Sequence, residues 1–134
     1  MTRIFRDIMI PAGKLVGIHA HNNQQCAFAN TLEAQENGSK YLDATINGMG
    51  RGAGNCPLEA LLGYLNGEKY HVEPILGFVG SEMQALKESG AEWGYNTSYL
   101  ITGLTNRHPR GAITATKSGN TDYVQQYKYH TYDS

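Results

Sequence analysis

Two strand-forming segments alternate with two helix-forming segments over residues 14–66, and this alternation limits the possible folds more than any other feature of the chain. Apolar residues concentrate at positions 14–21 and 41–46, which predicts two buried strands. Helical spacing of apolar side chains follows each strand, and Asn37-Gly38 and Asn66-Gly67 are typical of helix ends. Strand, helix, strand and helix with short connections favour a parallel sheet of the α/β class.

Two histidines share one face of the first predicted strand. Because side chains alternate along a strand, His19 and His21 lie on one face, whereas Val16, Ile18 and Ala20 make the other face apolar. Two imidazoles at this spacing can bind one cation, and imidazole suits Zn, Mn, Fe or Co, while an added carboxylate favours Mn or Mg. The alternative is that both rings are ordinary polar residues at a strand end.

Four alternating glycines follow the second predicted strand. Gly48, Gly50, Gly52 and Gly54 let the backbone approach a ligand closely, and a helix start after them favours a carboxylate or phosphate. The loop also fits the G-x-G-x-x-G/A fingerprint of dinucleotide sites. That reading is weaker, because polar residues interrupt the preceding strand and no acidic residue ends a strand about twenty residues later.

The polar residues around this loop have alternative possible roles. Asn55 is a metal ligand or a helix cap, and Cys56 lies near a helix start that lowers a thiol pKa, with Pro57 expected in the first helical turn. Asp43 and Thr45 share one strand face, where they either steady a histidine from behind or simply fill the polar end of the sheet.

Residues 67–134 are expected to form a mostly helical region beyond the α/β part, which spans residues 1–66. Helices are predicted over 73–89, 95–106 and 122–132, and 111–120 resembles a loop. The net charge is −1 and the charged residues are interspersed, so no charge pattern in the sequence indicates binding to nucleic acid or to a membrane. The two cysteines are expected to be free thiols in the cytoplasm, since no secretory start or long apolar run is present.

Four sequence blocks resemble one enzyme superfamily in their order and spacing. They are His19-Ala20-His21-Asn22-Asn23 and residues 29–34, 43–50 and 52–59. These blocks are similar to the pyruvate carboxyltransferase-like, or HMG-CoA lyase-like, superfamily, closest to its 4-hydroxy-2-oxovalerate aldolase branch. The resemblance implies that His19, His21 and Asn55 bind a divalent metal, with Mn first and Mg, Co or Zn as alternatives. It also implies Lewis-acid cleavage or formation of C–C bonds in a 2-oxo acid or acyl substrate.

The resemblance implies a partial TIM (β/α)8 barrel, because a complete barrel needs eight strands and roughly 250 residues. The chain matches only the last two β/α units, and the segment before them does not match the front of the barrel, where the family carries an aspartate ligand. We therefore expect the chain alone to lack turnover and to need an N-terminal barrel half. A homo-oligomer is the other possible partner. A second functional hypothesis is a non-catalytic assembly or regulatory module, and a third is an anion- or nucleotide-binding protein that uses the glycine loop.

Overall fold

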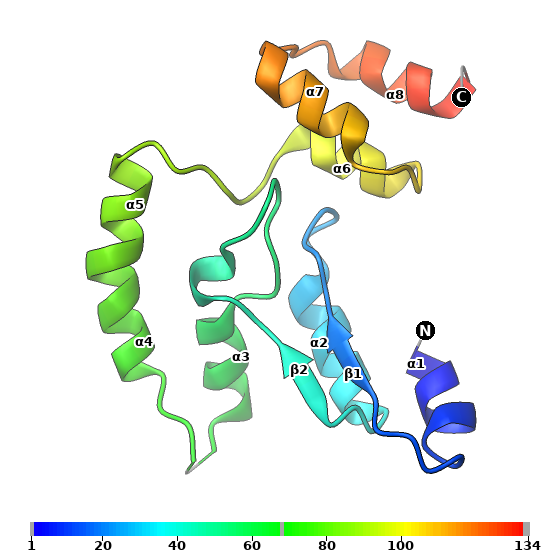
Figure 1. The fold of residues 1–134 in the computed structure, drawn as a ribbon, viewed down its shortest axis with the longest axis vertical. Helices are drawn as coiled ribbons and strands as arrows, with labels where there is room; N and C mark the ends of the chain where they lie inside the picture. Colours follow the sequence, from blue (N-terminus) through cyan, green and yellow to red (C-terminus); the bar gives the residue numbers. More distant parts are fainter. Residues whose placement is uncertain (1, 68, 133–134) are drawn as a thin grey trace.

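The computed structural model of the protein describes residues 2–67 and 69–132 and shows an α/β arrangement with a small sheet and many helices (Figure 1). The two strands are β1 (Gly17–His19) and β2 (Tyr41–Asp43). The helices are α1 (Thr2–Ile4), α2 (Ala27–Glu36), α3 (Leu58–Leu65), α4 (Glu73–Phe78), α5 (Gln84–Glu88), α6 (Thr97–Leu104), α7 (Arg110–Ser118) and α8 (Tyr123–Tyr132).

The predicted parallel sheet is confirmed, although its strands are shorter than expected. β1 pairs in parallel with β2, and His19 stands opposite Asp43 in the register. Further along the chain the pairing continues as isolated bridges, which join His21 to Asn55 and Thr45 to Pro57. The polar and glycine residues at these ends interrupt the regular ladder, so the sheet frays where the candidate site begins.

One apolar cluster supports this sheet from the face that the alternation of side chains predicts. Val16 and Ala20 are buried, whereas Leu15 on the opposite face is 71% exposed. The cluster is made by the inner face of β1, the first turns of α2, β2 and helix α3, and its members are Ile18, Ala20, Ala27, Phe28, Leu32, Leu42, Ala44, Cys56, Leu61 and Leu65. Burial of this apolar face holds the crossover helix α2 and the following helix α3 against the sheet.

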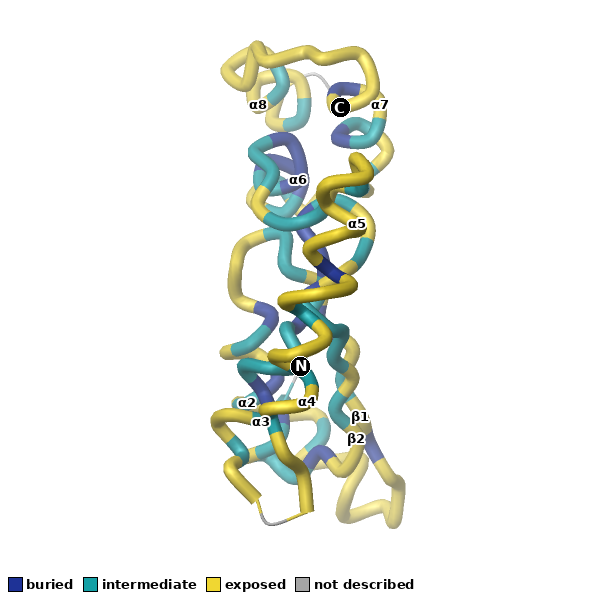
Figure 2. The backbone as a smooth tube through the Cα atoms, turned by 90° about the vertical axis from the view of Figure 1, so that its left-hand side faces the viewer, coloured by how far each residue is buried: buried dark blue, intermediate teal, exposed yellow. Residues whose placement is uncertain are grey.

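The predicted helix over 73–89 is present as one continuous rod. Helices α4 and α5 are joined by a π-helical stretch, Val79–Met83, and the rod ends at Ser89. Most of the rod is exposed, and Met83 in the π-helical stretch is its buried exception (Figure 2). None of the described helices combines the length and the apolar character that crossing a lipid bilayer demands.

Helices α6, α7 and α8 form a separate group beyond the carboxyl ends of the strands (Figure 1). The predictions of helices over 95–106 and 122–132 are confirmed as α6 and α8, but the loop expected over 111–120 is wrong. Residues 110–118 form α7, in which Ala112 and Ala115 are buried. Glycine and threonine lower the intrinsic helix propensity of this stretch, and packing of the two alanines overrides it. Gly119, at φ +66°, ends the helix.

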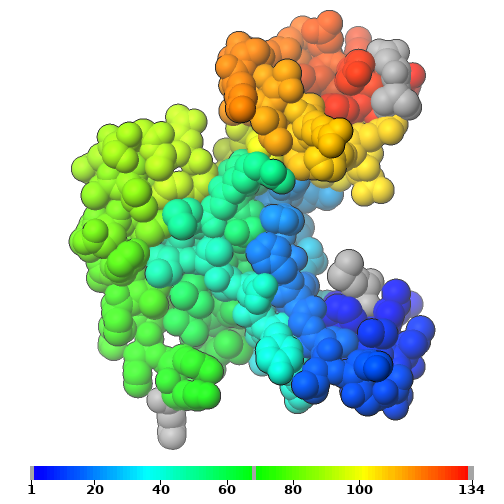
Figure 3. All heavy atoms as spheres, viewed as in Figure 1, coloured from blue at the N-terminus to red at the C-terminus, as the bar shows by residue number. Residues whose placement is uncertain are grey.

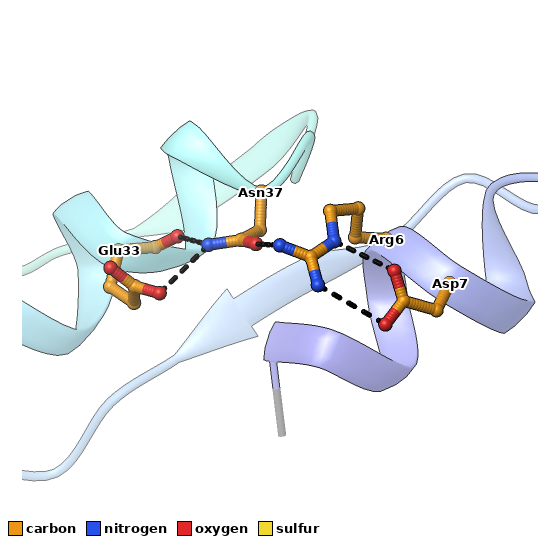
Figure 4. Close-up of polar contacts among 4 residues, drawn as sticks. All are labelled: Arg6, Asp7, Glu33 and Asn37. Carbon is orange, nitrogen blue, oxygen red and sulfur yellow. Dashed lines mark hydrogen bonds and ion pairs between the residues drawn. The ribbon is translucent and has the colours of Figure 1, made fainter.

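The N-terminal segment rests on the end of α2 through polar contacts (Figure 4). Arg6 pairs with Asp7 at 2.7 Å and also donates to Asn37 Oδ1, while the Asn37 amide donates to Glu33. The Asp7 carboxylate raises the pKa of Arg6, and the same pairing lowers the pKa of Asp7. Both groups are exposed, so solvent screens the pair and it positions this segment only weakly.

Candidate metal site

The two histidines of β1 and its extension lie side by side. Their ring centroids are 4.9 Å apart and the rings meet edge to face at 83°. Both residues are exposed, and both line a cavity of about 350 Å³ that also touches Thr2, Asn30 and Glu33. Figure 3 shows the molecule hollowed between the N-terminal segment and the α6–α8 group, beside the chain that carries β1. Two imidazoles at this separation face open space, where a cation and a substrate have room.

Asp43 contacts the first of these rings from the neighbouring strand. Its Oδ2 atom lies 3.3 Å from His19 Nδ1, because the register places the two residues opposite each other. A carboxylate on one ring nitrogen leaves Nε2 as the nitrogen available to a metal and fixes the orientation of the ring. This is the contact expected of a carboxylate that steadies a metal-binding histidine, and the role itself stays a prediction.

Asn55 is brought next to the histidines by pairing between distant parts of the chain. Its backbone forms an antiparallel bridge with His21, and the Asn22 N–H donates to Gly54 O at 2.8 Å. The Asn55 amide nitrogen donates to Met49 O at 3.1 Å, so the amide oxygen is the atom directed elsewhere. The structure therefore brings together the backbones of the two residues that the sequence analysis assigned to one site.

The alternative role of Asn55 as a helix cap is wrong. Helix α3 begins at Leu58, its N-cap is Pro57, and no side chain caps it. Residues 55–57 are extended because they pair with His21 and Thr45, and Pro57 stands just before the helix rather than within its first turn. At helix α2, whose N-cap residue is Cys26, Asn22 Oδ1 accepts from the Ala27 N–H at 3.1 Å.

The glycine loop is held by its own backbone. Asn55 N donates to Gly48 O at 3.0 Å, and a Cβ on Gly54 would collide with that same carbonyl oxygen. Only glycine fits there, because the residue also adopts φ +78°. The N–H groups of Gly50, Arg51 and Gly52 donate to no other described residue. The loop does not open directly into α3, which weakens the dinucleotide reading further.

Two buried polar groups lie beneath this loop. Cys56 is fully buried, and burial raises the pKa of its thiol, against the lowering expected from a helix start. The prediction of free thiols is confirmed for both cysteines. Thr45 Oγ1 is buried and has no hydrogen-bond partner among the described residues, although a buried hydroxyl normally finds one.

The donor set has the chemistry of a divalent-metal site that is open on one side. Two imidazole nitrogens are borderline donors that suit ions such as Zn, whereas an amide oxygen is a harder donor that suits Mn or Mg. Within residues 2–67 and 69–132 no three His, Cys, Asp or Glu side chains cluster closely enough to hold a metal ion. The two imidazoles line one cavity, whereas Asn55 is paired with His21 through its backbone and does not line that cavity. The residues present therefore fit a metal only as a partial set that needs a further protein ligand.

Sequence reasoning missed the part of the helical region that touches this site. Trp93 Nε1 donates to Asn47 O at 2.9 Å, and the Gly94 N–H donates to Gly52 O at 3.0 Å. The sequence around Trp93 does not predict these contacts, because the residues that Trp93 and Gly94 contact lie more than forty positions earlier in the chain.

Comparison with known proteins gives one family and two kinds of relative. The model of the family described as HMGL-like matches residues 2–79, which are 78 of the 134 residues. The 2-isopropylmalate synthases of Nostoc sp. and Crocosphaera subtropica are each 37% identical to the chain over 91 residues. These matches cover 68% of this chain and 17% of each relative, so the chain spans less than a fifth of the length of these relatives.

A solved structure resembles the chain over more of its length. It is called "Crystal structure of the N-terminal domain of a putative aldolase from Bacteroides vulgatus". The two share 30% sequence identity with a TM-score of 0.68, and the match covers 84% of this chain and 38% of the other. The match extends over more of the chain than the family model, so it includes part of the helical region.

Proposed function

Because this chain belongs to the HMGL-like family, we propose that it supplies the last two β/α units of a (β/α)8 barrel to a metal-dependent enzyme. The enzyme would make or break C–C bonds of 2-oxo acids, as an aldolase, lyase or related acyl-transferring synthase. The observation that carries this proposal is the pairing of His21 with Asn55 beside the edge-to-face contact of His19 with His21. Chemistry at the carboxyl ends of parallel strands is the rule in such barrels.

Three side chains of this chain would hold the cation. His19 and His21 offer ring nitrogens, and Asn55 offers the amide oxygen left over by its bond to Met49. When bound, a divalent metal, with Mn first and Mg, Co or Zn as alternatives, withdraws electron density from the 2-oxo group of the substrate. Asp43 accepts from His19 and keeps the ring in one tautomer and orientation.

The glycine loop would hold the negative end of the substrate. Its N–H groups at Gly50, Arg51 and Gly52 are available to the oxygens of a carboxylate. The loop would then orient the scissile bond beside the metal ligands.

The remaining barrel strands would join at the free edge of β1. Within the part of the chain that the structure describes, β1 pairs only with β2, and the apolar Leu15 just before β1 is exposed. An unpaired edge flanked by apolar side chains is unfavourable in water and favours a partner strand. We therefore expect an N-terminal barrel half, or a second copy of the chain, to cover this edge. The free thiols of Cys26 and Cys56 fit the expected reducing cytoplasm.

Metal binding by the chain itself tests the site. Titration with Mn²⁺, followed by the electron paramagnetic resonance of free Mn²⁺, should show one site in the unaltered chain. His21→Ala should weaken it by more than the about 10- to 100-fold that losing an outer partner costs. The control is His71→Ala, which removes an exposed imidazole elsewhere. Equal Mn²⁺ affinity in both variants would refute the proposed ligand set.

Turnover tests the rest of the proposal. The chain alone should release no pyruvate from a 4-hydroxy-2-oxo acid in the presence of Mn²⁺, and addition of an N-terminal barrel half should restore release. Pyruvate release by the isolated chain would contradict the need for a partner. Continued inactivity after mixing would favour the alternative of an assembly module, which the exposed apolar side chains around β1 also support. Nucleotide binding that survives loss of both histidines would favour the third alternative, a nucleotide site.

A further inference from the structure

One helical segment touches the loops that follow both strands. This segment, residues 93–104, contains α6 and is called the α6 bridge below. The α6–α8 group lies beyond the strand ends, and the chain reaches it from α5 on the far side of the glycine loop (Figure 1). The bridge is thus the first part of the helical region that the site meets.

The α6 bridge binds the glycine loop at three places. Trp93 Nε1 donates to Asn47 O, and the Gly94 N–H donates to Gly52 O. The Tyr99 ring lies so close to Gly52 that an added Cβ would stand 2.3 Å from the ring. Ala53 is buried in the same cluster as Tyr99. These contacts fix the loop that leads directly into Asn55.

The other end of the α6 bridge binds the loop after β1. Gln24 Nε2 donates to Gly103 O at 2.8 Å. The approach is close because Gly103 has no side chain: an added Cβ would lie 2.9 Å from Gln24 Cγ and 3.3 Å from Asn23 Cβ. This loop follows directly after His21, so the bridge contacts the two loops that border two of the candidate ligands.

We infer that the α6 bridge is a positioning element of the candidate metal site and holds in place the two loops that adjoin the directly paired His21 and Asn55. The inference rests on the proposed function. The two loops are also joined directly, by the bridge between His21 and Asn55 and by the hydrogen bond from Asn22 N to Gly54 O. A metal tolerates little displacement of its ligands, so groups that hold the ligands in place control affinity. The α6 bridge would hold the ligands in place from the helical region, without itself contacting a bound metal.

Two substitutions at opposite ends of the bridge test the inference. Trp93→Phe keeps a ring but removes the N–H that holds Asn47, and Gly103→Ala pushes the Gln24 side chain away. Each should weaken Mn²⁺ binding by about tenfold. The matched control is Gly63→Ala, which also adds a methyl group within a helix but meets nothing within 4 Å. Its Mn²⁺ affinity should equal that of the unaltered chain.

The outcomes separate this inference from the proposed function. Unaltered Mn²⁺ affinity in both bridge variants, with binding by the parent chain intact, overturns the inference. If the parent chain does not bind Mn²⁺, the proposed metal site is refuted instead. Amide hydrogen exchange then tests whether the α6 bridge holds the two loops in place. The Asn22 and Asn55 amides donate across and within the two loops. Both should exchange about tenfold faster in the two bridge variants than in Gly63→Ala, and equal rates overturn the inference.

Discussion

Replacement of Gly52 by alanine should destabilise the chain more than a change of one methyl group suggests. The new Cβ would stand 2.3 Å from two carbon atoms of the Tyr99 ring, and Gly52 adopts φ +61°. The left-handed conformation costs a non-glycine residue about 1–2 kcal/mol. Forcing a methyl group into a packed contact costs about 1–3 kcal/mol more. The expected loss in free energy of unfolding is therefore about 2–5 kcal/mol.

Two further glycines separate the two contributions. Gly13 has φ +73° and open space around it, so Gly13→Ala carries the conformational cost alone. Gly63 lies in α3 with open space, and Gly63→Ala should stabilise the chain by about 0.5–1 kcal/mol. The assay is urea unfolding followed by the fluorescence of Trp93, the single tryptophan, whose indole binds the same loop. A loss for Gly52→Ala no larger than that for Gly13→Ala would refute the contact with Tyr99.

A double-mutant cycle assigns the excess cost to one ring. Tyr99→Ala removes the side chain that an added Cβ at Gly52 would strike. In that background Gly52→Ala should cost only the conformational term, so the two changes should couple by about 1–3 kcal/mol. Additive effects would mean that the loop and helix α6 pack independently, and the reasoning for the α6 bridge would lose its main contact.

Two other predictions concern the buried thiol of Cys56 and the half-buried carboxylate of Glu59. Because burial raises the pKa of Cys56, the unfolded chain ionises first as pH rises past about 9. The free energy of unfolding should therefore fall as pH rises above that value, by at most about 1.4 kcal/mol per pH unit. In urea unfolding, Cys56→Ala should abolish this pH dependence, whereas Cys26→Ala should retain it. Glu59 Oε2 accepts from the Asn47 N–H at 2.9 Å, so Glu59→Ala should cost about 1.5–3 kcal/mol. The exposed Glu73 gives the control, and equal losses for Glu59→Ala and Glu73→Ala would show that the carboxylate does not hold the loop.

The candidate site shows how much of the structure the local sequence pattern can predict. Alternation along the first strand predicted that His19 and His21 share a face opposite Val16 and Ala20, and burial confirms it. The spacing could not choose between two roles for Asn55. A helix cap depends on residues next to it, whereas its bridge to His21 joins positions 34 residues apart in the sequence.

The helical region shows what the local sequence pattern could not predict. Residues 111–120 have weak intrinsic helix propensity, and they are largely helical because Ala112 and Ala115 are buried in the packed α6–α8 group. Nothing in the local sequence marks Trp93 or Tyr99 as neighbours of the glycine loop. Their contacts exist only once the rod of α4 and α5 has carried the chain back to the strand ends.

The sequence by itself determined that strands and helices alternate over positions 14–66 and which face of β1 is apolar. Periodicity and residue chemistry are local properties, so they can be read without coordinates. Only the tertiary structure decided that Asn55 lies beside His21 and that α6 joins the two loops around them. Those relations depend on non-local pairing and close packing, which place distant residues together only after the chain has folded.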